Sequence, residues 1–309
     1  MKNTYNTLEK YKKYMDINFE YYKIFYFVAK YRNITKAAAA LGSNQPNVTR
    51  IMKLLENQLG CRLFIREARG VSLTEEGERL FSHVEIAYDH LLSGEREISY
   101  HEADGEGTVE IGATETALHL LLLDALGEFR AKYPKIRIKI HNHTTLEILK
   151  YLVSGRLDFA VITTPFDAAK SFRREELLVF QEILVGGRQY GSFEGKVLEL
   201  KGLKDFSWIG LGRGSVTYDF YRNFFIEHEA DIELDMEVAT SDLMIPLIRN
   251  NLGIGFVPEA LAQPLLDRKE LVRLDFGFQA PARAVEIIYD RRQGRSMPAD
   301  AFYRYLKNR

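Results

Sequence analysis

The pattern of hydrophobic and polar positions changes character along the 309-residue chain. Before residue 60, apolar positions recur every three or four residues, which is typical of amphipathic helices. Residues 74–98 keep this spacing without a proline and predict one long helix. After residue 108, short alternating or wholly apolar runs take turns with helical stretches. This order indicates an α/β domain behind a helical N-terminal part.

Residues 34–53 predict two short helices joined by a tight turn at Gly42. Four alanines at positions 37–40 favour the first helix, because alanine loses no side-chain entropy there. Thr35 is expected to cap its start through the hydroxyl group. Gly42 would end it, because glycine adopts a left-handed backbone without strain.

The second helix would begin at Asn44, which can cap it, with Pro46 in the first turn, where a missing N–H costs nothing. Five apolar residues at helical spacing predict a buried face: Val48, Ile51, Met52, Leu55 and Leu59. The opposite face carries amides and cations, which suit base edges and phosphates in a major groove: Gln45, Asn47, Thr49, Arg50 and Lys53. Ordinary packed helices also have polar faces, so this pattern alone leaves the function open.

Charge separates the two parts of the chain. Residues 1–72 contain 13 Lys and Arg against 5 Asp and Glu, a net charge of +8, whereas the remainder contains 29 against 38, a net charge of −9. A basic segment joined to an acidic one is typical of a nucleic-acid-binding module attached to another domain. The aromatic-rich residues 19–31 would supply a third helix. Residues 60–73 alternate around a glycine-containing turn and predict a β-wing that places Arg66 and Arg69 near the DNA backbone.

Four ordered stretches resemble the winged helix-turn-helix of LysR-type transcriptional regulators: residues 37–41, 44–50, 54–66 and 73–77. The resemblance implies that the long helix pairs with a second subunit and sets two recognition helices on a near-palindromic operator. It also implies a periplasmic-binding-protein-like effector domain with a ligand cleft. Asn44 and Asn47 stand where small residues are common in the family, and Thr49 replaces a frequent serine. We therefore expect the base preference to differ from that of relatives.

The expected fold class is α/β, with a helix-rich winged helix-turn-helix first and a two-subdomain effector domain after it. The expected segments are an N-terminal extension (1–14), the DNA-binding domain (15–73), a linker helix (74–100), a hinge (101–107) and the effector domain (108–309). By resemblance, subdomain I covers 108–164 and 271–309, and subdomain II covers 165–270, so that the chain crosses near Thr163 and returns near Leu271. We also hypothesise that Met15 is the native start, which mass spectrometry of the protein made from its own promoter would decide.

The effector domain is predicted to contain a mostly parallel sheet with helices on both faces. Strands are expected at 108–113, 135–141, 157–162, 177–185, 208–211, 234–238, 253–257, 272–276 and 285–289. Helices are expected at 117–132, 146–154, 218–228, 242–250 and 299–307.

Effector contacts are expected where strands end beside helix N-termini. The residues at these positions are mostly hydroxyl-bearing: Thr114, Glu115, Thr116, His143, Thr144, Thr163, Thr240 and Ser241. Hydroxyls and helix N-terminal amides favour a small anion or carboxylate, but threonine and serine are also ordinary helix caps. Glu115 would repel an anion or receive a cationic amino group, so the charge of the effector stays open.

Catalytic chemistry has little support. Cys61 is the only cysteine, which excludes disulfides within the chain, and we expect it to be a buried thiol in the strand that enters the wing. His141 and His143 share one face of a strand but lack a third metal ligand, and residues 210–214 are glycine-rich without phosphate-binding spacing. We predict no catalytic residue, no metal and no cofactor. No apolar run reaches membrane-spanning length, so a cytoplasmic protein is expected.

Two functions compete at this point. The first is a sequence-specific transcriptional regulator whose DNA binding responds to a small-molecule effector. Its expected partners are double-stranded DNA, a small acid or amino acid, a second subunit in a homodimer or homotetramer, and, as one option, RNA polymerase. The alternative is a cytoplasmic α/β binding protein or enzyme with a helical dimerisation module. The charge division and the polar helix that contains Arg50 favour the first.

Overall fold

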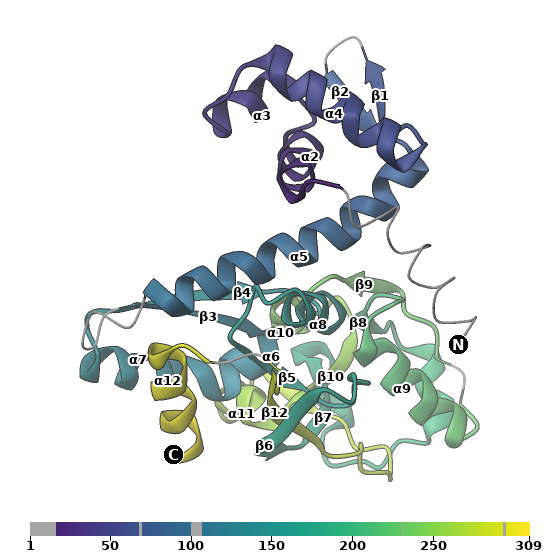
Figure 1. Cartoon of the computed structure of the whole chain (residues 1–309). Helices are drawn as coiled ribbons and strands as arrows, with labels where there is room; N and C mark the ends of the chain where they lie inside the picture. The colour runs from purple at the N-terminus through teal and green to yellow at the C-terminus, as the bar shows by residue number, and fades with distance from the viewer. Residues whose placement is uncertain (1–16, 68–69, 100–106, 231, 293–294) are drawn as a thin grey trace, which may run out of the picture. The chain divides into compact units, whose positions relative to one another are not determined.

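The computed structural model describes residues 17–67, 70–99, 107–230, 232–292 and 295–309 (Figure 1). Its internal contacts divide the chain into two compact units, Met1–Glu95 and Arg96–Arg309. The predicted N-terminal extension, Met15, Arg69 and positions 101–106 of the predicted hinge lie outside the described residues. Within the described ranges, no helix is both long and apolar enough to cross a membrane.

Three helices build the core of the first unit: α2 (Phe19–Tyr31), α3 (Ile34–Ala40) and α4 (Gln45–Leu59). Their apolar sides meet around the fully buried Phe25, Val48 and Leu55. Gly42 has a φ of +60° in the turn between α3 and α4, as predicted. The three helices therefore confirm the helical reading of the sequence.

An asparagine side chain caps the start of each of these three helices. Asn44 Oδ1 accepts a hydrogen bond from Asn47 N at 2.9 Å, which confirms Asn44 as the cap of α4. The prediction that Thr35 caps α3 is wrong. Asn33 does so by accepting a bond from Lys36 N at 2.9 Å, and Thr35 lies inside the first turn with its side chain exposed.

The antiparallel strands β1 (Phe64–Glu67) and β2 (Gly70–Leu73) confirm the predicted wing. Cys61 precedes β1 and is only partly buried, so its expected place as a buried residue of the strand is wrong. The long helix α5 (Glu75–Ser99) follows, with three glutamates in its first turn, where the helix dipole favours negative charge.

A five-stranded sheet organises one half of the second unit: β3 (Gly107–Ala113), β4 (Ile136–Asn142), β5 (Phe159–Thr163), β6 (Phe172–Phe180) and β12 (Arg283–Asp290). Helices cover both of its faces: α6 (Glu115–Ala117), the π-helical turn η2 (Leu118–Leu122), α7 (Leu123–Lys132), α8 (Thr145–Val153) and α12 (Met297–Lys307). Alternate residues of β5 enter the two cores, since Phe159 and Val161 pack with α7 and α12, whereas Ile162 packs with α8.

The other half contains smaller sheets: β7 (Glu182–Gly187), β10 (Ile254–Pro258) and β11 (Leu271–Arg273) in one, and β8 (Ile209–Leu211) with β9 (Met236–Val238) in another. The helices around them are α9 (Val216–Glu227), α10 (Met244–Arg249) and α11 (Glu259–Asp267). Phe224 and Phe225 of α9 pack on one side, and Ile248 and Ala262 of α10 and α11 pack on the other. Short 3-10 turns complete this half: η3 (Arg188–Phe193), η4 (Leu200–Asp205) and η5 (Ser241–Leu243).

The sheets differ from the prediction in three ways. In the large sheet β3, β4 and β5 pair parallel, but β12 runs antiparallel to both of its neighbours, β5 and β6. In the smaller sheet β7 pairs antiparallel with β10 and β11. The single strand expected at 177–185 is two strands, β6 and β7, divided at Gln181. The chain thus changes sheets at Gln181 and re-enters the large sheet at Arg283, rather than near Thr163 and Leu271. Helix α11 was not predicted, because Pro258 and Pro264 interrupt the helical pattern there.

Candidate DNA-binding and effector sites

The polar side of α4 holds its side chains in a hydrogen-bonded row. Asn47 Nδ2 donates to Ser43 Oγ at 3.2 Å, and Arg50 Nη2 donates to Asn47 Oδ1 at 3.1 Å. Gln45 and Arg50 are exposed, whereas Asn47 is half-buried. A cation held in one orientation on a solvent-facing helix loses little further side-chain freedom when it contacts a base. The structure thus places Asn47 between the turn and Arg50.

The wing is fastened to the helices at several points. Glu56 of α4 accepts hydrogen bonds from Leu63 N at 2.8 Å and Phe64 N at 3.3 Å, directly before β1 and at its start. Val71 N donates to Arg32 O at 3.1 Å at the end of α2. Gly70 has a φ of +142°, and a Cβ there would lie 2.4 Å from Arg32 O, so glycine is required at this position.

A hollow of about 1000 Å³ lies between α4 and the wing. Thr49, Lys53 and Arg66 all line it, so three predicted DNA contacts from two separate elements share one surface. Thr35, Asn44 and Pro46 are exposed on α3 and at the start of α4. These positions fit a protein that receives a nucleic-acid backbone between helix and wing.

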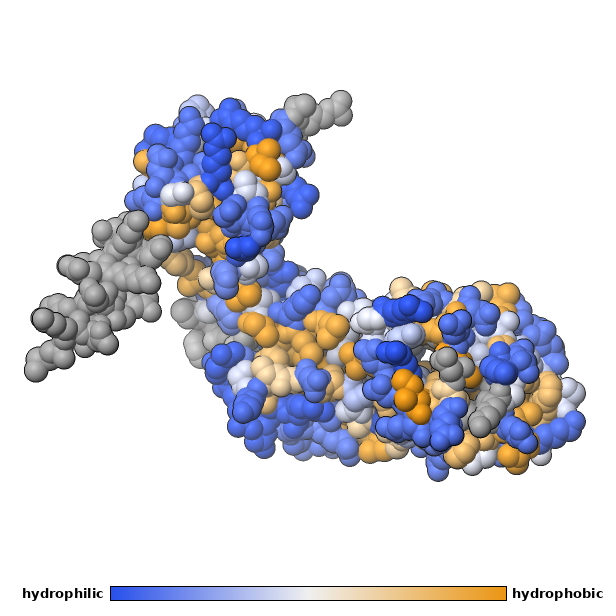
Figure 2. Space-filling view, turned by 90° about the vertical axis from the view of Figure 1, so that its right-hand side faces the viewer, coloured by the Kyte–Doolittle hydropathy of each residue, from blue (hydrophilic) through white to orange (hydrophobic). Residues whose placement is uncertain are grey.

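A second cavity, of about 800 Å³, opens in the second unit, and its size is that of a typical small-ligand pocket. Five aromatic residues contribute to its wall, which is called the aromatic wall below: Trp208, Tyr218, Tyr221, Phe225 and Phe256. The face drawn in Figure 2 has a small opening in this unit, bordered by hydrophilic and hydrophobic groups together.

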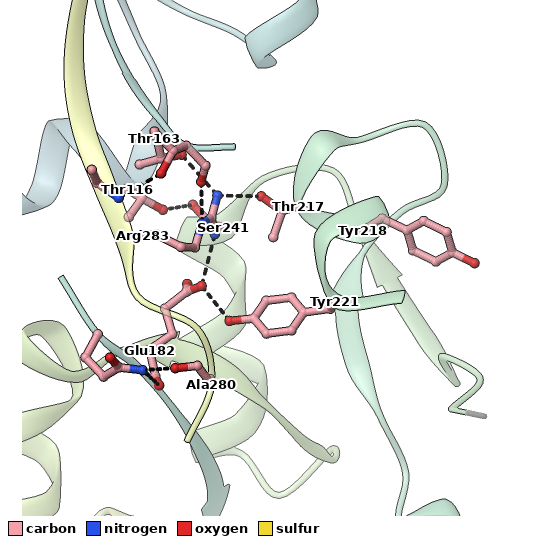
Figure 3. Close-up of polar contacts among 12 residues, drawn as sticks. Thr116, Thr163, Glu182, Thr217, Tyr218, Tyr221, Ser241, Ala280 and Arg283 are labelled. Atoms are coloured by element: carbon pink, nitrogen blue, oxygen red, sulfur yellow. Dashed lines mark hydrogen bonds and ion pairs between the residues drawn. The ribbon is translucent and has the colours of Figure 1, made fainter. Parts of the chain in front are cut away.

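Two residues that line this cavity form a buried ion pair, whose contacts are drawn in Figure 3. Arg283 Nη1 lies 3.0 Å from Glu182 Oε2, and the two side chains are 3% and 5% exposed. Tyr221 donates its hydroxyl to Glu182 at 2.5 Å, and burial, followed by the charge of Glu182, raises the pKa of Tyr221 well above its ordinary value.

The other nitrogens of Arg283 also have partners. They donate to Thr164 O at 2.6 Å, Thr163 Oγ1 at 3.3 Å and Thr217 Oγ1 at 3.1 Å. The guanidinium group therefore joins the end of β5 to the start of α9 and uses four of its five N–H donors within the protein.

The predicted effector contacts fall into two groups. Thr116 and Ser241 line the cavity, and their hydroxyl oxygens lie 3.2 Å apart (Figure 3). Thr163 does not line the cavity itself, but its hydroxyl oxygen accepts a hydrogen bond from Arg283, which does. Glu115 is next to Thr116 in the chain but does not line the cavity, and burial, followed by the negative charge of Asp242, raises its pKa.

The remaining predicted contacts do not line this cavity. Thr144 caps α8 in a reciprocal arrangement with Glu147, and His143 packs its ring edge-on against Tyr151. Thr114 Oγ1 is buried without a hydrogen-bond partner, and Thr240 precedes η5 without capping it through its side chain.

Sequence reasoning missed Arg283, Glu182 and the aromatic wall. A charged residue inside an otherwise apolar strand was the available signal, because such residues are buried only when paired. Such a charged residue is Arg283 in residues 282–285 and Glu182 in residues 180–183. The partners are 101 positions apart, so the pairing itself could not be read from spacing.

Comparison with known proteins gives the same division of the chain. Residues 19–78 match the model of bacterial regulatory helix-turn-helix proteins of the lysR family, and residues 102–309 match the LysR substrate binding domain. The chain belongs to the LysR family. Like other LysR-type transcriptional regulators, it combines a DNA-binding helix-turn-helix with an effector-binding domain.

Individual relatives are distant. The chain is 26% identical to the HTH-type transcriptional regulator YofA of Bacillus velezensis over 86% of this chain and 90% of that protein. It is 24% identical to a probable RuBisCO transcriptional regulator of Phaeodactylum tricornutum, over 91% and 93% of the two chains. The structure of full-length CbnR with its target DNA shares the fold, with a TM-score of 0.68 at 19% identity over 94% of this chain and 99% of that one.

Proposed function

We propose that this LysR-type regulator reads an operator through the polar side of α4 and that the wing contacts the flanking phosphates. The observation that carries the proposal is the row from Ser43 through Asn47 to Arg50, beside a hollow that Lys53 and Arg66 line. Amides and guanidinium groups are the side chains that distinguish bases in the major groove. The DNA complex of CbnR, which has the same fold, supports this use of the first unit.

The 800 Å³ cavity is the proposed effector site, with Thr116 and Ser241 as hydroxyl contacts. Thr116 belongs to the half with the large sheet and Ser241 to the other half, so a ligand between them would change their separation. A ligand shifts such an equilibrium only by its difference in affinity for the two arrangements. We propose that this shift alters the operator complex of an oligomer acting in the cytoplasm.

Two further features belong to the proposal. Leu91 of α5 is 49% exposed in the single chain, as expected of a helix that pairs with a second subunit. Because its relatives are transcriptional regulators, we propose that the chain is not an enzyme.

The test is a gel-shift titration of the purified full chain on DNA from upstream of its own gene. Specific binding should survive an excess of random DNA and weaken steeply as salt rises. A chain that binds both DNAs equally, or neither, would remove the proposed function. A second titration with candidate effectors then tests the cavity, because an effector must change the operator affinity or the footprint.

A further inference from the structure

A single residue, Glu56, shapes the path of the chain from α4 into the wing. Its backbone carbonyl accepts hydrogen bonds from Gly60 N at 2.8 Å and Cys61 N at 3.2 Å, where the helix ends. Its side-chain Oε1 then accepts from Leu63 N at 2.8 Å and Phe64 N at 3.3 Å. Glu56 therefore receives four backbone N–H groups of this connecting segment.

The wing depends on such anchors. β1 and β2 have four residues each, and a two-stranded hairpin of this size is at best marginally stable by itself in water. Thr74 holds the same segment from the other side, since its Oγ1 donates to Arg62 O at 2.7 Å and accepts from Gly77 N of α5 at 3.0 Å. Leu63, between these contacts, is 1% exposed. The start of the wing is thus held between α4 and α5.

Three exposed cations line the hollow beside this segment: Lys53, Arg62 and Arg66. Among the described residues, none of the three has a salt-bridge partner. Cations without partners can contact phosphates, and each phosphate contact adds to the salt dependence of DNA binding. Lys53 belongs to α4 itself, whereas Arg62 directly precedes the residues that Glu56 holds and Arg66 follows them. The position of both arginines therefore depends on this anchor.

Glu56 also lines the hollow, where its negative charge alone would repel a phosphate. The two backbone N–H groups that its side chain accepts give a physical reason for a carboxylate there. Both bonds go to the same oxygen, Oε1, so an uncharged amide side chain of equal length can accept them as well. Anchoring and charge therefore lead to opposite expectations for substitutions at this position.

We propose that Glu56 is a positioning residue for DNA binding. It holds the start of the wing where Arg62 and Arg66 reach phosphates beside the bases that α4 contacts, and it acts through these two arginines. This inference rests on the proposed function and adds the residue on which the phosphate contacts of the wing depend.

The experiment measures the operator affinity of the purified full chain at several salt concentrations. Glu56→Gln keeps an oxygen at the position of Oε1 and should bind at least as tightly as the parent chain. Glu56→Asp keeps the charge but is one methylene too short to place its oxygen there. This variant and Glu56→Ala should bind about tenfold more weakly, the scale of a modest loss of contacts. Their slope of log affinity against log salt should fall by about 0.9 to 1.8, which corresponds to one or two lost phosphate contacts.

Gln58→Ala is the matched control, because Gln58 is exposed two residues further along α4 and is not among the described residues that line the hollow. Thermal melts followed by circular dichroism accompany the titrations, since a merely structural role would lower the melting temperature and leave the salt slope of the folded chain unchanged. If Glu56→Ala does not fold, the comparison of Glu56→Asp with Glu56→Gln decides.

The proposal is overturned if Glu56→Asp keeps the affinity and slope of the parent chain, or if Glu56→Gln weakens binding as much as Glu56→Asp does. It is also overturned if Glu56→Ala binds more tightly, as loss of repulsion alone would cause. Failure of the proposed function has a different outcome, namely a parent chain that shows no preference for the operator.

Discussion

The two candidate sites of this chain organise polar side chains in opposite ways. On α4 Gln45, Arg50 and Lys53 are exposed, and the hydrogen bonds of Asn47 and Arg50 reach only three or four positions along the chain. In the effector cavity the central charges are buried, and Arg283 meets a carboxylate 101 positions away. On α4, hydrogen-bonding groups remain available to DNA. In the cavity, the guanidinium group of Arg283 connects β12 with β5, β7 and α9. The same residue types are thus proposed to serve DNA recognition in one unit, whereas they join distant segments in the other.

The largest expected effect tests the buried pair. Arg283→Met leaves the Glu182 carboxylate without its cation, and loss of one partner of a buried ion pair costs about 3–5 kcal/mol of unfolding free energy. The only tryptophan, Trp208, lies in the core of the same unit, so its fluorescence during urea unfolding reports the change. Arg213→Met is the control and should cost at most about 0.5 kcal/mol, because Arg213 is an exposed residue. Equal losses in both variants would contradict the assigned role.

Acid should weaken the second unit through a partly buried carboxylate, that of Glu175. Glu175 accepts hydrogen bonds from Tyr303 at 2.7 Å, Tyr289 at 3.1 Å and Lys307, and these lower its pKa to about 2 against the cost of burial. Because this pKa lies below its ordinary value of 4.5, the stabilisation is present above pH 4.5 and is lost as the pH falls toward 2.

The shift corresponds to at most about 3.5 kcal/mol of unfolding free energy. Urea titrations of the full chain between pH 6 and 3, followed at Trp208, would measure the slope. In Glu175→Gln the slope should flatten, since that variant has no carboxylate to protonate at this position. An unchanged slope would assign the acid sensitivity to other groups.

Local and distant interactions differ in how far the sequence predicts them. The end of α3 at Gly42, the cap at Asn44 and the extent of α2 were predictable, because a helix start or end depends on residues within one turn. The division between β6 and β7 at Gln181 was not, since both flanking segments are apolar and only pairing with β12 and β10 separates them. The cavity shows the same limit: Thr116 and Ser241 follow strands and could be proposed, whereas Glu182 and Arg283 needed the tertiary structure.

A smaller effect, on DNA affinity, is expected from Arg50 of α4, and it distinguishes a contact to a base from a contact to a phosphate. Arg50→Ala should weaken operator binding by about 1–3 kcal/mol if the guanidinium contacts a base, with little change on random DNA. Asn47→Ala should have a smaller effect in the same direction, because it releases Arg50 from its hydrogen bond without removing the charge. Gel shifts on both DNAs at two salt concentrations measure this. Equal losses on operator and random DNA would make Arg50 a phosphate contact.

The smallest expected effect distinguishes two roles of Asn44, which caps α4 and is also a predicted DNA contact. Asn44→Ala removes the acceptor for Asn47 N and should cost about 1 kcal/mol of stability in the first unit. Asn44→Ser keeps a capping oxygen, so its thermal unfolding should match that of the parent chain. If Asn44 also contacts a base, Asn44→Ser will change the preferred operator sequence in a selection from randomised DNA. A serine variant that retains both the stability and the sequence preference would show that Asn44 only caps α4. The DNA-contacting residues of this helix would then start at Gln45.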